Sequence, residues 1–142
     1  MKICIGADHR GYELKNFLIQ TLTDYSWIDE GTHTSERTDY PMYAHKVCKA
    51  LGEGKAPYGI LICGSGVGMA IAANRFRGIY AALCWNEGVA RLAREDDGTN
   101  VLILPSDFVT HVQALSIFQA WITARFKDGR YQERLELIDK IK

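Results

Sequence analysis

The sequence has no net charge and no long apolar run. Its 142 residues include 17 basic and 17 acidic side chains. There is no basic stripe and no basic patch interleaved with aromatics, so we expect no nucleic-acid partner. The longest apolar runs have strand length, which argues against a membrane-spanning helix and a membrane partner. The N-terminus enters an apparent strand at once instead of a signal peptide, so we expect a cytoplasmic protein.

The cysteines lack the spacing of a metal site or a redox couple. None of the four is part of a C-x-x-C pair or has a neighbouring histidine pair, which argues against a zinc site and a dithiol couple. We therefore expect reduced thiols and no metal. Cys4 and Cys84 lie in apparent strands and Cys48 in an apparent helix, so these three are interpreted as packing residues.

The richest segment for chemistry is 58–69, where a short apolar run ends in a cysteine followed by three alternating glycines. The run Tyr58–Ile62 is typical of a strand buried on both faces of a parallel sheet. The glycines would lead into a helix through Ala73, whose free N–H groups favour anions and lower a thiol pKa. We expect Cys63 to be accessible, partly thiolate and able to abstract a proton. The alternative is a small core residue beside a tight turn.

Two other glycine-loop chemistries fail on spacing. A dinucleotide fingerprint requires G-x-G-x-x-G, but Met69 occupies the third glycine position. A Walker-type phosphate loop requires Gly-Lys-Ser/Thr, and this loop has no lysine. We expect no cofactor.

Strand-like and helix-like segments alternate along the chain. This order predicts an α/β protein: a three-layer α/β/α Rossmann-like sandwich with a five-stranded parallel sheet and right-handed crossovers, as a single domain over residues 1–142. The expected strands are 2–6, a short one at 27–28, 58–62, 79–84 and 100–104. The first expected helix follows Gly11, the second begins near Pro41 and the third runs through Ala73. The last three cover 87–94, 108–126 and 130–141.

Ligands of parallel sheets bind beyond the carboxyl ends of the strands. Asp8 and His9 after the first strand should meet Cys63 at that rim. Asp8 either orients a substrate or simply caps the next helix. The pair Asp96-Asp97 precedes a strand, so topology alone assigns it to the opposite rim, and only an unusual loop path or another subunit could bring it to the site.

Arg130 and Arg134 are four residues apart on one expected helix. Such a pair can clamp a phosphate. On its own, such a pair is usually a solvated face, where Glu133 and Glu136 could pair with the arginines.

Taken together, the motifs resemble the family of ribose-5-phosphate isomerase B and galactose-6-phosphate isomerase over nearly the whole chain. The segments that carry the resemblance are Gly6–Gly11, Gly31-Thr32, Thr38–Pro41, Ile62–Gly68, Ala72–Asn74, Thr99–Val101, and Gly129-Arg130 with Arg134.

The resemblance implies a metal-free aldose to ketose isomerisation through a cis-enediol, in a dimer whose sites lie between subunits. By position, Cys63 would be the base that moves the proton between C1 and C2. The enediolate oxygen would be stabilised by Ser65 and by backbone N–H groups of Gly64, Gly66, Val67 and Gly68.

The resemblance also implies the groups that bind the phosphorylated sugar. Asp8 and Tyr40 would contact its hydroxyls or ring, and His9 would help to hold the phosphate. Arg130 and Arg134 would reach the phosphate from the partner subunit.

The chain departs from the family pattern at three positions. Ribose-type members usually have a ring-opening histidine at the position of Asp96 and an asparagine at that of Asp97. They usually have a phosphate-binding arginine at that of Asp107, where a carboxylate would repel a dianion. Either a buried Asp96 serves as the acid/base, or the open-chain sugar is taken directly.

The resemblance therefore predicts interconversion of D-ribose 5-phosphate and D-ribulose 5-phosphate. The alternatives are an isomerase for another aldose, one subunit of a hetero-oligomeric galactose-6-phosphate isomerase, or an inactive sugar-phosphate-binding protein. We expect a homodimer or a dimer of dimers, with the C-terminal helix, about 130–141, docked on the partner.

Overall fold

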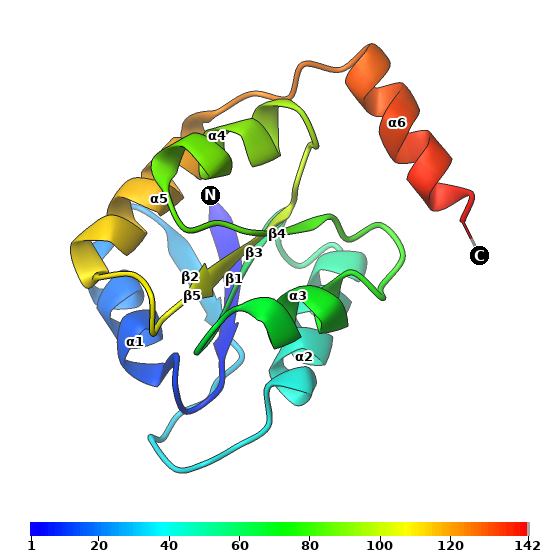
Figure 1. Ribbon diagram of the computed structural model, residues 1–142. Helices are drawn as coiled ribbons and strands as arrows, with labels where there is room; N and C mark the ends of the chain where they lie inside the picture. The colour runs from blue at the N-terminus through cyan, green and yellow to red at the C-terminus, as the bar shows by residue number, and fades with distance from the viewer. Residues whose placement is uncertain (142) are drawn as a thin grey trace.

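Five parallel strands alternate with six helices in the computed structural model, which describes residues 1–141 (Figure 1). The strands are β1 (Lys2–Ala7), β2 (Ser26–Asp29), β3 (Tyr58–Cys63), β4 (Ala81–Leu83) and β5 (Val101–Pro105). The helices are α1 (Tyr12–Thr21), α2 (Tyr40–Gly52), α3 (Val67–Ala73), α4 (Glu87–Glu95), α5 (His111–Thr123) and α6 (Arg130–Asp139).

The sheet order is β2-β1-β3-β5-β4, with every neighbouring pair parallel. Helices cover both faces, as Figure 1 shows: α2 and α3 lie on one face, and α1, α4 and α5 on the other. The predicted α/β/α sandwich with five parallel strands is confirmed. No helix within the described residues is long and apolar enough to cross a membrane.

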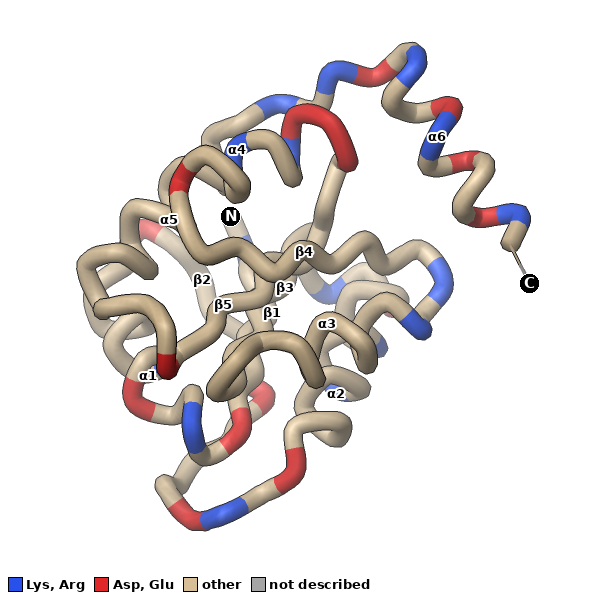
Figure 2. Tube along the Cα trace, in the orientation of Figure 1, with Lys and Arg blue, Asp and Glu red and all other residues tan. Residues whose placement is uncertain are grey.

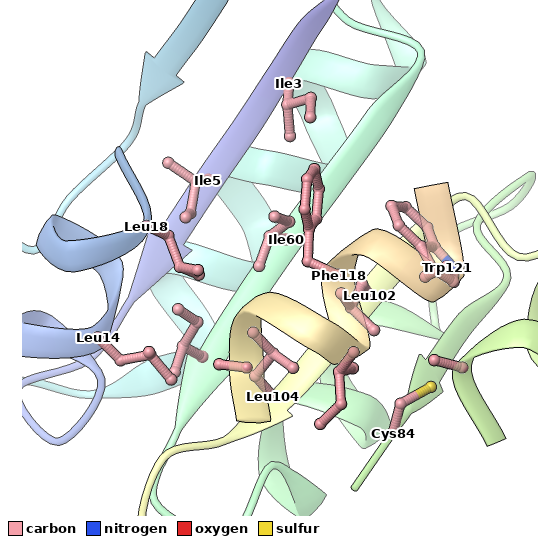
Figure 3. Packing of buried hydrophobic residues seen from close by; sticks show 14 of the residues in the cluster. Ile3, Ile5, Leu14, Leu18, Ile60, Cys84, Leu102, Leu104, Phe118 and Trp121 are labelled. Carbon is pink, nitrogen blue, oxygen red and sulfur yellow. The ribbon is translucent and has the colours of Figure 1, made fainter. Parts of the chain in front are cut away.

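Alternate residues of the central strand β3 face the two helical layers, as the two-residue period of a strand requires. Ile60 and Ile62 pack with the α1 and α5 side, whereas Leu61 and Cys63 pack with the α2 and α3 side. Figure 3 shows the first of these clusters, in which Phe118 of α5 meets strand residues. Burial of each large apolar side chain contributes about 1.5–3 kcal/mol to the free energy of unfolding. The two helical layers therefore stabilise the sheet, and with it the carboxyl ends of the strands.

Two elements are shorter than expected. β4 was expected over 79–84, but it covers only Ala81–Leu83, because Asn100 Oδ1 accepts the Tyr80 N–H (2.9 Å) and Asn74 binds both backbone groups of Ala81. α5 was expected from 108, but it begins at His111. Thr110 caps it in a reciprocal box with Gln113, which satisfies N–H groups that a longer helix would have used.

The last helix, α6, stands apart from the sandwich in Figure 1. Leu135 is its one buried residue, and the Tyr80 hydroxyl donates to Asp139 (2.7 Å). Leu137 and Ile138, together with Ile141 just beyond the helix, are each more than half exposed. In a single chain, α6 therefore leaves part of its apolar surface exposed to solvent.

Candidate active site

The topology brings the carboxyl ends of β1, β3 and β5 side by side. Cys63 is opposite Pro105 in the β3–β5 register, and the Asp8 N–H donates to Ile62 O (3.2 Å). Asp8, His9 and Cys63 therefore lie at one rim, as the alternating pattern predicted. The glycine turn 64–66 leads directly from this rim into α3.

Cys63 itself differs from expectation, because it is 5 % exposed and packs with Met69. Burial raises its pKa above the ordinary 9.0, and the Asp8 charge raises it further. Backbone N–H groups of Met69 and Gly66, with the Arg10 cation, lower the pKa, but by less than burial raises it. The expected accessible, low-pKa thiol was wrong for the free protein, since desolvation exceeds the effect of the N–H donors.

Gly66 makes the turn possible. Its φ of +76° is left-handed, a region that side chains other than glycine adopt at a cost. A Cβ there would also collide with Leu83. Two residues on, the Tyr40 ring lies against Gly68, where an added Cβ would be 2.5 Å from Cζ. The glycines thus bring the chain close to Cys63 and seat Tyr40 on the start of α3, while Ser65 and Val67 are exposed.

His9 connects the rim to the loop between β2 and α2. Its Nδ1 lies 3.1 Å from Thr38 O and 3.3 Å from Thr38 N. Thr38 Oγ1 in turn lies 2.9 Å from the Tyr43 hydroxyl. The His9 ring is therefore positioned by the 30–39 loop, next to the start of the helix that carries Tyr40.

Asp8 accepts hydrogen bonds from the N–H groups of Arg10 (2.9 Å) and Gly11 (3.2 Å) through Oδ1. These bonds fix the turn that precedes α1, but Asp8 is not its N-cap, because Gly11 occupies that position and no side chain caps the helix. Since Oδ1 makes both bonds, Oδ2 is the oxygen that a sugar hydroxyl could approach.

Asp96 and Asp97 lie at the opposite end of the sheet, before β5 begins. Figure 2 shows the acidic run at the end of α4, away from the glycine turn. Lys127 Nζ donates to Asp96 Oδ1 (2.7 Å), and the Asp96 side chain is 28 % exposed. A role for Asp96 as the acid/base required a buried side chain, and in the single chain Asp96 is only partly buried. The predicted location of Asp96 and Asp97 at the far rim is confirmed.

Arg130 and Arg134 belong to α6, which lies apart from the sheet and from α3 (Figure 2). Within residues 1–141 neither forms an ion pair, so the expected alternative pairing with Glu133 and Glu136 is absent there. The Arg134 guanidinium instead lies over the Tyr131 ring, 4.6 Å from its centroid. One chain alone does not bring these arginines to Cys63.

Sequence reasoning missed Arg10 and Ser106. The Ser106 hydroxyl lies 2.9 Å from Arg10 O and 3.0 Å from Cys63 O, so it ties three rim loops together. Arg10 forms an ion pair with Asp107. The available signal was position: both residues directly follow rim ends of strands that neighbour β3.

The described residues contain no group of three or more histidine, cysteine, aspartate or glutamate side chains that could hold a metal ion. All four cysteines are free and buried. Burial raises the pKa of Cys4 and Cys84 to about 12 and that of Cys48 to about 11, which confirms these three as packing residues.

The fold and the rim define a Rossmann-like α/β protein with acid–base groups around a glycine turn. The chain belongs to the ribose/galactose isomerase family, whose family model matches residues 3–138. The resemblance drawn from the motifs is thereby confirmed.

Individual relatives match this chain over nearly their whole length. The chain is 45% identical to ribose-5-phosphate isomerase B of Escherichia coli strain K12, over 99% of this chain and 95% of that protein. A crystal structure of ribose 5-phosphate isomerase from Thermotoga maritima superposes with a TM-score of 0.97 at 41% identity, covering 99% and 98% of the two chains. Ribose-5-phosphate isomerase B from Mycoplasma genitalium, with bound ribulose-5-phosphate, gives 0.92 at 38% identity, covering 98% and 94%.

Proposed function

We propose that this protein is an aldose–ketose isomerase that interconverts D-ribose 5-phosphate and D-ribulose 5-phosphate. The observation that carries the proposal is the position of Cys63 at the end of the central strand, directly before the glycine turn, where the backbone N–H groups of Gly66 and Met69 act to lower the pKa of its thiol. Its support is the full-length similarity to ribose-5-phosphate isomerases B.

In the proposed reaction the Cys63 thiolate removes the proton from C2 of the open-chain aldose. The electron pair of that C–H bond forms the C1–C2 double bond while the carbonyl pair moves onto the aldehyde oxygen, which then takes a proton from water to give the cis-enediol. Cys63 then returns its proton to C1 as the C2 hydroxyl gives its proton to water, which yields the ketose. Ser65 and N–H groups of the 64–68 turn stabilise the charged oxygen. Asp8, His9 and Tyr40 hold the sugar and its phosphate.

The raised pKa of Cys63 leaves the free enzyme mostly as the thiol near neutral pH. The N–H groups of Gly66 and Met69 nevertheless stabilise the thiolate once it forms. When the pKa of a base lies above the ambient pH, only a small fraction of the base is deprotonated, but that fraction binds a proton tightly. The reaction therefore uses a small population of thiolate with high proton affinity.

We further propose that the active unit is at least a homodimer, with α6 docked on the partner. The exposed apolar side chains Leu137, Ile138 and Ile141 support this, since burial of such surface drives association. Beside α6, an open pocket of about 980 Å³ includes Asp97 and Ile138 in its lining. In this arrangement Arg130 and Arg134 bind the partner's substrate phosphate, and Asp96 and Asp97 act across the subunit contact.

The four free thiols fit a reducing compartment. We accordingly propose a cytoplasmic enzyme within a single 1–142 domain.

The direct test is proton NMR of ribose 5-phosphate with the protein in heavy water. We expect ribulose 5-phosphate to form with loss of the C2 proton signal, because the base exchanges its proton with solvent during the enediol stage. Absence of both ketose formation and exchange contradicts the proposed reaction; turnover of another aldose phosphate alone would reassign the substrate.

The shared site predicts complementation between two inactive variants. Cys63→Ala and Arg134→Ala should each be nearly inactive alone. After unfolding and refolding together, a mixed dimer contains one site with both groups intact, so equal mixing should restore roughly a quarter of wild-type activity. The control is refolding each variant by itself. A mixture no more active than its parts contradicts the contribution of Arg134 from the partner.

A further inference from the structure

An ion pair lies directly on the glycine turn and has no role in the reaction described above. Arg10, from the loop after β1, binds the Asp107 carboxylate from the loop after β5. Both side chains remain accessible, at 58 % for Arg10 and 36 % for Asp107. The inference drawn from this pair rests on the proposed function, because it concerns how the same site holds a sugar phosphate.

Backbone contacts fix the pair against the turn. A Cβ on Gly64 would lie 2.8 Å from both Arg10 Nε and Asp107 Oδ2, so only glycine allows both groups to approach. The Asp107 N–H donates to Gly64 O (3.0 Å). Ser106 links Arg10 O to Cys63 O. The pair is thus built into the rim, next to the reacting thiol.

The charge of Arg10 already reaches the reaction centre, since it is among the groups that lower the pKa of Cys63. A guanidinium offers five N–H donors in a planar fork that matches phosphate oxygens. One carboxylate uses only some of these donors, and the exposed part of Arg10 can donate the others. Arg10 therefore has both the location and the donors to bind an anion that enters beside Cys63.

Asp107 works against that anion. The ion pair carries no net charge. The Asp107 carboxylate therefore repels an approaching phosphate dianion while the Arg10 guanidinium attracts it. We propose that Arg10 is a cationic phosphate-binding group that the chain supplying Cys63 adds to His9, and that Asp107 is its counter-ion, which weakens the hold of this site on phosphate. The partner's contribution through α6 adds to this group and does not replace it.

The effect of removing each charge has opposite sign. Asp107→Asn frees Arg10 from its counter-ion and should tighten inorganic phosphate binding and lower the KM for ribose 5-phosphate by roughly three- to tenfold, a range that solvent screening limits. Arg10→Met should weaken phosphate binding and raise that KM by roughly tenfold or more, since a charge-assisted donor is lost. In both variants kcat should change less than KM, because Arg10 binds the phosphate and not the reacting carbons.

Glu53→Gln is the matched control. Glu53 also forms an ion pair, with Lys55, at the end of α2 away from the rim, and its substitution changes net charge by the same amount as Asp107→Asn. Its phosphate affinity should equal that of wild type. If it matches Asp107→Asn instead, the effect is one of net charge and the proposal is overturned.

The binding measurement is a ³¹P NMR titration of inorganic phosphate with each variant, which requires no turnover. Tighter binding by Asp107→Asn and weaker binding by Arg10→Met support the inference even if ribose 5-phosphate is not a substrate, so its outcome is separable from that of the proposed reaction. Unchanged phosphate affinity in Asp107→Asn, or weaker affinity, overturns it. Arg10→Lys, which keeps the charge but loses the fork, should fall between wild type and Arg10→Met.

Discussion

Cys63→Ala should reduce isomerisation and C2 proton exchange by roughly 10²–10⁴-fold, the usual contribution of a positioned acid–base group. The fold should survive, since the change removes one sulfur from a 5 %-exposed site. Cys48→Ala is the matched control, because it removes an equally buried thiol from α2. NMR exchange rates in heavy water provide the measurement. Full proton exchange in Cys63→Ala contradicts the assignment of the base.

The same residue sets the pH dependence of the wild-type enzyme. Burial raises the pKa of Cys63 above 9.0, and the active form is the thiolate. The kcat/KM should therefore rise with pH, by about tenfold per unit below the thiol pKa, because this ratio reports the free enzyme. A profile that is flat between pH 7 and pH 9 contradicts a buried thiol as the base.

Asp29→Ala should cost about 3–5 kcal/mol of unfolding free energy, as expected when a buried charge loses its partner. Lys15 is 1 % exposed, and its Nζ donates to Asp29 Oδ2 (2.7 Å) and to the neutral Asn16 Oδ1 (3.1 Å), so Asp29 supplies the opposite charge. Asp29 Oδ1 also accepts the Gly31 N–H (2.9 Å), at the start of the loop that positions His9. Urea unfolding measures the loss, with an unchanged m-value expected.

Two controls interpret that result. Lys15→Met removes the buried charge itself and leaves the partly exposed Asp29 to water, so it should cost less than Asp29→Ala. Glu53→Gln breaks a solvent-exposed pair and should leave the unfolding midpoint nearly unchanged. Equal costs for Lys15→Met and Asp29→Ala would contradict a stranded ammonium as the cause.

The fold could be predicted because its determinants are local and repetitive. Buried runs such as Tyr58–Ile62 and the helical spacing of Leu14 and Leu18 each report a single element, and their alternation leaves few topologies. The length of β4 could not be predicted, since it depends on side chains of Asn74 and Asn100 that bind its backbone from elsewhere in the chain.

The candidate site was predictable by position but not by environment. Asp8, His9 and Cys63 follow neighbouring strand ends, so topology assigns them to one rim. The burial of Cys63 depends on Met69 and the packing of α2 and α3, which no local pattern reveals. The Arg10–Asp107 pair joins loops 97 positions apart in sequence, and only the strand order shows that they meet.

The strand that carries Cys63 has hydrogen-bonded neighbours on both sides, whereas Asp8 and His9 lie on a loop, and Arg130 and Arg134 lie on the last helix, α6. Opening of a protein is graded, from fraying loops up to global unfolding. The reactive sulfur thus sits in the part of the molecule that we expect to open last. Adjustment of the loops and of α6 around a substrate therefore need not disturb the geometry around the sulfur.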